Sequence, residues 1–131
     1  MDELVRFGVS LDQRLLAEFD RHIRRRHYTN RSEALRDLIR NNLVGDEWDD
    51  DKETVGTITF VYDHHVRDLT SKLTDIQHDY HGQILSGMHV HLDHNHCLEV
   101  LVVKGKGTEI KKVADALVSV KGVKHGKLTM T

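Results

Sequence analysis

Apolar and polar residues follow two different periods within the first 45 positions. Over residues 4–11 they alternate, as in a strand that has one face on a core. Two apolar stripes at helical spacing follow. The first comes after Asp12, in an N-cap position, and the second after Asn30, which has Glu33 three residues later as in a capping box. This segment therefore predicts a strand, a helix, a turn and a second helix.

A segment this short seldom buries enough apolar surface alone, and a single strand leaves both of its edges unpaired. Two copies solve both problems if their strands pair antiparallel and their helices interlock. The resulting two-stranded ribbon would fit the major groove of B-DNA, and the start of the second helix would suit a DNA phosphate. The residues predicted to contact double-stranded DNA are Arg6, Gly8, Ser10, Asn30, Arg31 and Ser32. A generic helical dimerisation module is the alternative.

The rest of the chain predicts a ferredoxin-like β-α-β-β-α-β unit. Strands are expected at 55–63, 84–92, 97–103 and 123–130, and helices at 66–80 and around 110–117. The overall fold class is therefore α+β. An acidic stretch over 46–54, with Lys absent before it and common after it, is expected to be a solvated linker. The predicted domains are thus 1–45 and 55–131.

Both faces of the predicted hairpin carry apolar residues. We expect the set Met88, Val90 and Leu92 to lie under the helices, with Leu98, Val100 and Val102 across the turn. The opposite face mixes apolar residues with potential ligands: Leu85, His89, His91, Cys97, Glu99, Leu101 and Val103. An apolar open face on so small a domain suggests packing between subunits, and with dimeric N-terminal domains this predicts a homotetramer, a dimer of dimers.

The hairpin also predicts a metal site. His89 and His91 are two residues apart on one strand, so their imidazoles project the same way, and Cys97 begins the next strand on the same face. Two imidazoles and a thiolate can hold one metal ion, with one position left for a further ligand. His78 on the preceding helix is the candidate from a neighbouring subunit, and His81 is its rival.

Composition changes this picture little. The net charge of −2 averages an N-terminal segment rich in Arg with the acidic stretch, so it does not argue against DNA binding. The single Cys forms no intrachain disulfide, which favours a reducing cytoplasm, and neither a membrane span nor a signal peptide is expected.

One competing motif points to an enzyme. Residues 89–94 satisfy H-x-H-x-D-H, which looks like the ligand motif of metallo-β-lactamase-type hydrolases. That fold needs a much longer chain, with further ligands downstream of His94. We therefore expect no enzymatic activity.

The whole arrangement resembles the nickel-responsive transcriptional regulators, which are ribbon-helix-helix repressors with a C-terminal ferredoxin-like, ACT-type metal domain. The residues that carry the resemblance are Arg6, Ser10, 30–37, Gln77, His78, 89–91, 97–99 and 123–126. The resemblance implies one square-planar Ni(II) per subunit, bound by His89, His91 and Cys97 of one chain and His78 of another. Square-planar geometry with nitrogen donors suits Ni(II) or Cu(II), whereas Zn(II) prefers a tetrahedron.

The resemblance also implies repression of nickel uptake genes, and a potassium ion held with the help of Glu33 and Asp37. Glu99 is expected to support the metal ligands without binding the metal itself. A zinc- or copper-responsive regulator would use the same ligands. A metal-buffering protein would leave Arg6, Gly8 and Ser10 without a role.

Overall fold

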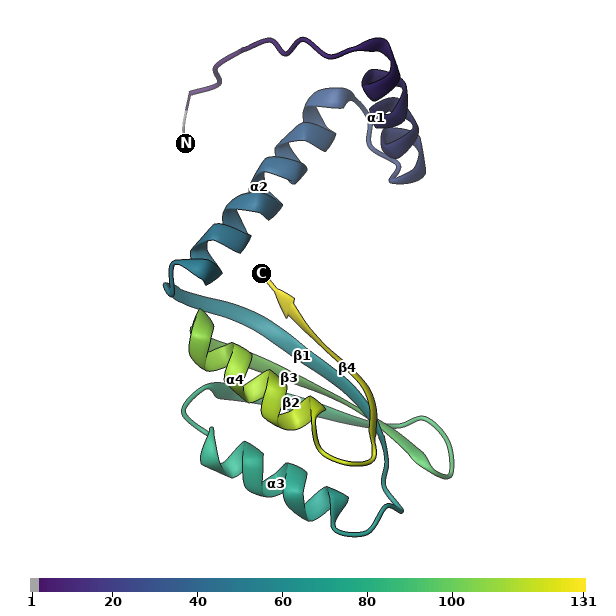
Figure 1. The fold of residues 1–131 in the computed structure, drawn as a ribbon, viewed down its shortest axis with the longest axis vertical. Coiled ribbons are helices and arrows are strands. Elements are labelled where there is room, and N and C mark those ends of the chain that lie inside the picture. The colour runs from purple at the N-terminus through teal and green to yellow at the C-terminus, as the bar shows by residue number, and fades with distance from the viewer. Residues whose placement is uncertain (1–2) are drawn as a thin grey trace. The chain divides into compact units, whose positions relative to one another are not determined.

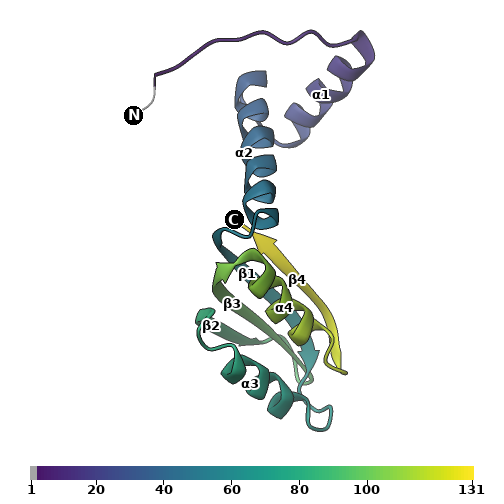
Figure 2. The same ribbon diagram turned by 60° about the vertical axis from the view of Figure 1, so that its left-hand side comes forward.

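The computed structural model describes residues 3–131. The chain divides into two compact units, residues 1–41 and 42–131. Figure 1 and Figure 2 show the same ribbon in two views, with the elements labelled in chain order. No helix in the described part of the chain combines the length and the apolar character that crossing a bilayer requires.

The first unit contains α1 (Gln13–Arg25) and the beginning of α2 (Arg31–Asp49). Asp12 caps α1, since its carboxylate accepts a hydrogen bond from the Leu15 backbone N–H at 2.8 Å. At the start of α2 the Asn30 side chain accepts from the Glu33 N–H at 2.9 Å, and the Glu33 carboxylate accepts from the N–H of Thr29 at 3.1 Å. Both predicted caps are therefore present.

The strand predicted over residues 4–11 does not form in the single chain. Residues 3–12 have no regular secondary structure, and Val5, Phe7 and Val9 are largely exposed. The physical reason is that a lone strand has no neighbour to accept and donate its ladder hydrogen bonds. A groove of about 710 Å³, lined by Phe7, Leu15, Leu38 and their neighbours, leaves the apolar stripes of this unit uncovered.

The second unit confirms the β-α-β-β-α-β order. Its elements are β1 (Glu53–Asp63), α3 (Leu69–Asp79), β2 (Ile84–His91), β3 (His96–Lys106), α4 (Gly107–Val118) and β4 (Val123–Met130). The strands form one antiparallel sheet in the order β2-β3-β1-β4. Both α3 and α4 cover the same face of this sheet (Figure 1, Figure 2).

The predicted assignment of the hairpin's faces is wrong. Met88, Val90 and Leu92 are 60%, 39% and 52% exposed, whereas Leu101 and Val103 are buried in the core. Because both alternating sets are apolar, alternation within the hairpin could not decide which set the helices cover. The pairing with β1 decides, because the buried face of β1 lies beside the other set. The cross-strand pairs on that face are Ile58 with Leu101, Phe60 with Glu99, and Tyr62 with Cys97.

The acidic stretch also differs from the expectation of a solvated linker. Helix α2 continues through it to Asp49, and Trp48 is completely buried in the core of the second unit. Asp51 then accepts hydrogen bonds from the backbone N–H and the hydroxyl of Thr108, at 2.9 and 2.8 Å, at the start of α4. The charges of this stretch face water, but one aromatic ring anchors the stretch to the sheet domain.

Candidate metal centre

Three strand ends bring the candidate ligands together. In the antiparallel register His91 pairs with Cys97, and Cys97 pairs on its other side with Tyr62 at the end of β1. His89 lies opposite Glu99. Since paired residues project to the same side of a sheet, His89, His91 and Cys97 share one face, as their spacing predicts. That face is the one covered by the helices, and the site lies where β1 and β2 end and β3 begins.

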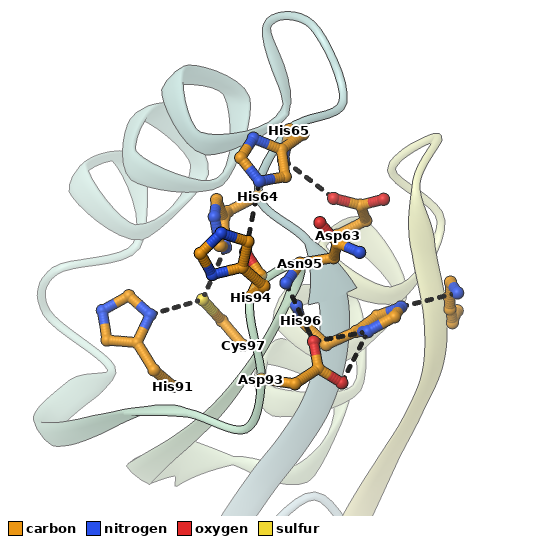
Figure 3. Close-up of polar contacts among 10 residues, drawn as sticks. Asp63, His64, His65, His91, Asp93, His94, Asn95, His96 and Cys97 are labelled. Carbon is orange, nitrogen blue, oxygen red and sulfur yellow. Dashed lines mark hydrogen bonds and ion pairs between the residues drawn. The ribbon is translucent and has the colours of Figure 1, made fainter.

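The thiol of Cys97 lies between two imidazoles (Figure 3). Its Sγ is 3.3 Å from Nδ1 of His64 and 3.4 Å from Nδ1 of His91. The three donor atoms lie within 4.8 Å of one another, and within residues 3–131 they form the one group of three such donors that is close enough to hold a metal ion. His64, which is not among the predicted ligands, is thus part of the cluster.

Cys97 is buried in surroundings that are unfavourable for a negative charge. Burial raises the pKa of its thiol, and the nearby carboxylates of Glu99, Asp93 and Asp63 raise this pKa further. The thiol is therefore neutral at physiological pH, and a metal ion that binds here must displace its proton. A metal also supplies the positive charge that these surroundings lack.

Of the other two predicted ligands, His89 lies near this cluster and His78 lies apart from it. The His89 ring is 5.1 Å from the His91 ring and 6.1 Å from the Tyr62 ring, measured between centroids, but His89 is not one of the three clustered donors. His78 is exposed near the end of α3, with its ring 6.0 Å from that of His81. The structure therefore joins His91 and Cys97 directly and leaves His78 available to a neighbour.

Glu99 connects three elements behind the ligands. Its carboxylate accepts a hydrogen bond from the Tyr62 hydroxyl of β1 at 2.9 Å, and another from the Gln77 amide of α3 at 2.9 Å. Burial and this carboxylate raise the pKa of Tyr62, which keeps the phenol protonated. Gln77 immediately precedes His78 and lines a small cleft of about 280 Å³ with His89, so Glu99 links the position of α3 to the strands that carry the ligands.

The β2–β3 turn is ordered by a single carboxylate. Asp93 accepts hydrogen bonds from the backbone N–H groups of Asn95 and His96, each at 2.8 Å, and these bonds lower its pKa to about 2. The His96 ring contacts Asp93 on one side and the Lys124 ammonium, at 2.7 Å, on the other. This arrangement fixes the start of β3, and with it Cys97.

Among the predicted DNA contacts the structure separates two groups. Arg6, Gly8 and Ser10 are exposed in the N-terminal segment, and Ser10 also lines the apolar groove of this unit. Arg31 instead makes a paired contact with Asp20, with both N–O distances 3.0 Å, and the Arg31 guanidinium lowers the pKa of that carboxyl. An Arg held in this way is less free to reach a phosphate than the prediction assumed.

The two predicted potassium ligands lie on α2. Asp37 accepts a hydrogen bond from the Tyr28 hydroxyl at 2.7 Å, and Glu33 accepts from the Thr29 N–H at 3.1 Å. These bonds hold both carboxylates on the same side of the helix, as expected for positions four residues apart.

Two protein families match the chain. The family described as the NikR C-terminal nickel-binding domain matches residues 55–131, and the ribbon-helix-helix family of the CopG type matches residues 5–44.

Similar proteins were found over the full length. A protein of Geobacter sulfurreducens and one of Pelobacter propionicus are each 61% identical over 132 residues, covering 100% of this chain and 95% of the relative. One from Syntrophus aciditrophicus is 56% identical over 131 residues, covering 100% and 96%. Each is named "Putative nickel-responsive regulator". An uncharacterized protein of Thermotoga maritima shares the fold over 60% of this chain and 98% of its own, with a TM-score of 0.55 and 18% sequence identity.

Proposed function

The chain belongs to the family of nickel-responsive regulators that join a ribbon-helix-helix domain to a nickel-binding domain, and on that premise we propose that it binds operator DNA in response to Ni(II). It is a regulator family and not a family of enzymes, so the H-x-H-x-D-H run is not a hydrolase motif here. The observation that carries the proposal is the thiol of Cys97 within 3.4 Å of an imidazole on the adjacent strand, in a chain whose N-terminal segment matches a DNA-binding family.

The residues present fit a nickel ion. Imidazole nitrogen and thiolate sulfur are donors that bind Ni(II) well, and the buried thiol becomes a thiolate when a metal replaces its proton. We propose that His89, His91 and Cys97 of one chain and His78 of a second copy hold one ion per subunit. The exposed position of His78 on α3 supports a role toward a neighbour.

Two uncovered apolar surfaces support a homotetramer. The exposed Phe7 and Leu15 of the first unit favour pairing of two ribbon-helix-helix domains, and the open sheet face with Met88, Val90 and Leu92 favours packing of two sheet domains. Two different self-associating domains on one chain give a dimer of dimers. Such a particle would present two ribbons to two half-sites, and we propose that the genes it represses in the cytoplasm serve nickel uptake.

The first prediction concerns the nickel response. In a gel-shift titration, wild-type protein should bind an operator, selected from a randomised DNA pool, at least about tenfold more tightly with Ni(II) than with a chelator. His78→Ala should lose most of this difference, because it removes the ligand proposed to couple two subunits. His81→Ala, one turn further along, is the matched control and should respond like wild type. DNA binding that is indifferent to nickel would contradict the proposal, as would a full response in His78→Ala.

The second prediction concerns the reading of bases. Arg6→Ala should weaken operator binding by about 1–3 kcal/mol and relax specificity, because an Arg on the ribbon can bind guanine through two hydrogen bonds. Arg14→Ala is the control, since Arg14 is exposed on α1 beside Glu18. Equal losses on operator and random DNA would instead make Arg6 a phosphate contact.

The third prediction concerns potassium. We propose that Glu33 and Asp37 contribute oxygen ligands to a potassium ion, as the family resemblance implies, and their fixed carboxylates on α2 support this. Nickel-dependent operator binding measured in potassium chloride should exceed binding in sodium chloride of equal ionic strength, and Asp37→Asn should reduce the difference. Equal binding in both salts would argue against the ion.

A zinc- or copper-responsive regulator is the second candidate. It is favoured by the types of the proposed ligands, because imidazole nitrogen and thiolate sulfur also bind Zn(II) and Cu(II). The same gel shift with each metal separates the candidates, because the regulating ion is the one that raises operator affinity. A metal buffer would bind the ions but show no metal-dependent change on DNA.

A further inference from the structure

His64 lies beside Cys97, although 33 residues separate the two in the sequence. It follows directly after β1, and its backbone N–H donates to the carbonyl of Asn95 at 3.0 Å, which ties this turn to the β2–β3 turn. The ring of His64 then reaches Cys97, with Nδ1 3.3 Å from Sγ. Three segments of one chain thus converge without any contribution from a second copy (Figure 3).

The distances from the sulfur to the two imidazole nitrogens suit a single ion bound by all three atoms. With a zinc–sulfur bond of about 2.3 Å and zinc–nitrogen bonds of about 2.0–2.1 Å, neighbouring donors in a tetrahedron are about 3.5 Å apart. The Sγ–Nδ1 distances of 3.3 Å to His64 and 3.4 Å to His91 are close to this value. His91 is exposed, so a water molecule can complete a fourth position.

We infer that His64, His91 and Cys97 form a single-chain site for a tetrahedral d¹⁰ ion such as Zn(II), separate in its ligand set from the nickel site. The two sites share His91 and Cys97, so one ion excludes the other. The single-chain site uses neither His89 nor His78. Zn(II) has no geometric preference from its d electrons, so it accepts the donors that one chain offers.

This site gives the protein a way to tell metals apart, a consequence that rests on the proposed function. An ion held by His64, His91 and Cys97 makes no bond to α3, so it lacks the direct hold on that helix that the His78 ligand gives to nickel. A ligand that does not distinguish two states of a protein does not shift their populations. Zinc would therefore occupy the chain without producing the nickel response.

A direct test compares His64→Ala with His65→Ala. His65 is the matched control: it is the next residue, its ring centroid is 4.2 Å from that of His64, and its Nε2 lies 3.2 Å from the backbone oxygen of His94 and not in the cluster. Zn(II) affinity is measured on the full chain by competition with a chromophoric chelator. Co(II) serves as the spectroscopic stand-in, since a thiolate ligand and tetrahedral geometry both give it characteristic absorption.

His64→Ala should weaken Zn(II) binding by at least about tenfold and remove the tetrahedral cobalt spectrum, since it deletes one of three protein ligands. His65→Ala should leave both unchanged. In His64→Ala the loss of nickel affinity should be much smaller than the loss of zinc affinity, while His89→Ala and His78→Ala should weaken nickel binding and spare zinc binding. Unchanged zinc affinity in His64→Ala would overturn the inference. Equal losses of zinc and nickel affinity would also overturn it, because His64 would then act only by positioning Cys97.

Separate controls distinguish a loss of folding from a loss of metal binding. His64→Asn keeps a polar side chain in the turn, and thermal unfolding of each metal-free variant shows whether the fold is retained. All these readings are of metal binding and not of DNA binding. If nickel failed to change operator affinity, the proposed function would fail, while the zinc and cobalt measurements would still decide for or against the single-chain site.

Discussion

Cys97→Ala should weaken nickel binding by on the order of a hundredfold or more and abolish the near-ultraviolet absorption of the nickel–thiolate bond. Loss of a ligand costs at least as much as loss of a group that only supports one, which itself is worth about 10–100-fold. Cys97 is fully buried and is the only thiol in the chain, so nothing nearby can replace the sulfur. Absorption titration with Ni(II) measures both quantities.

The nickel affinity measured in this titration should depend on pH in a definite direction. Burial and neighbouring carboxylates raise the pKa of the Cys97 thiol, so wild-type protein must lose a proton from this group when nickel binds. Nickel affinity should therefore increase as the pH rises. Cys97→Ser is the control for size. If the absorption persisted in Cys97→Ala, another residue would be the source of the band and the ligand assignment would be wrong.

Trp48→Ala should destabilise the chain by about 3–5 kcal/mol, the usual cost of removing a large buried aromatic side chain. Trp48 is completely buried at the end of α2, against Gly56 of β1 and Gly107 at the start of α4. A Cβ on Gly107 would clash with the carbonyl oxygen of Trp48, which shows how closely the backbone of α4 approaches. A typical domain is stable by only about 5–15 kcal/mol, so much of its stability would be lost.

Chemical denaturation followed by far-ultraviolet circular dichroism measures this effect, because the substitution removes the only tryptophan of the chain. Trp48→Phe should cost much less, since the indole N–H has no hydrogen-bond partner within the described residues and phenylalanine keeps most of the apolar contact. Leu43→Ala, at an exposed position on the same helix, should have little effect. A loss below about 1 kcal/mol for Trp48→Ala would show that the end of α2 does not depend on this anchor.

Much of the fold follows from local patterns. The strand predicted at 55–63 corresponds to β1, and the caps at Asp12 and Asn30 place the starts of α1 and α2. Periodicity also locates α3, although this helix begins at Leu69 and not at residue 66. These features depend on residues close in sequence, where side-chain spacing determines the structure.

The remaining features depend on which strands meet. The faces of the β2–β3 hairpin were misassigned because both are apolar, and only the pairing of Tyr62 with Cys97 separates core from surface. His64 was overlooked for a related reason, since 33 residues separate it from Cys97. A signal was available: if the strand over 55–63 runs antiparallel to the one that begins at Cys97, the residues just after the first strand lie beside the start of the second.

The end of α2 has a further consequence for how the chain folds. Asp46, Glu47 and Asp49 place negative charge at the C-terminal end of a helix, where the helix dipole disfavours it. We therefore infer that the buried indole of Trp48, and not the preceding part of α2, stabilises the last turns of this helix. Because residues 42–131 form one compact unit, we expect the amide protons of these turns to exchange together with those of the sheet, and the boundary between the two units lies within α2.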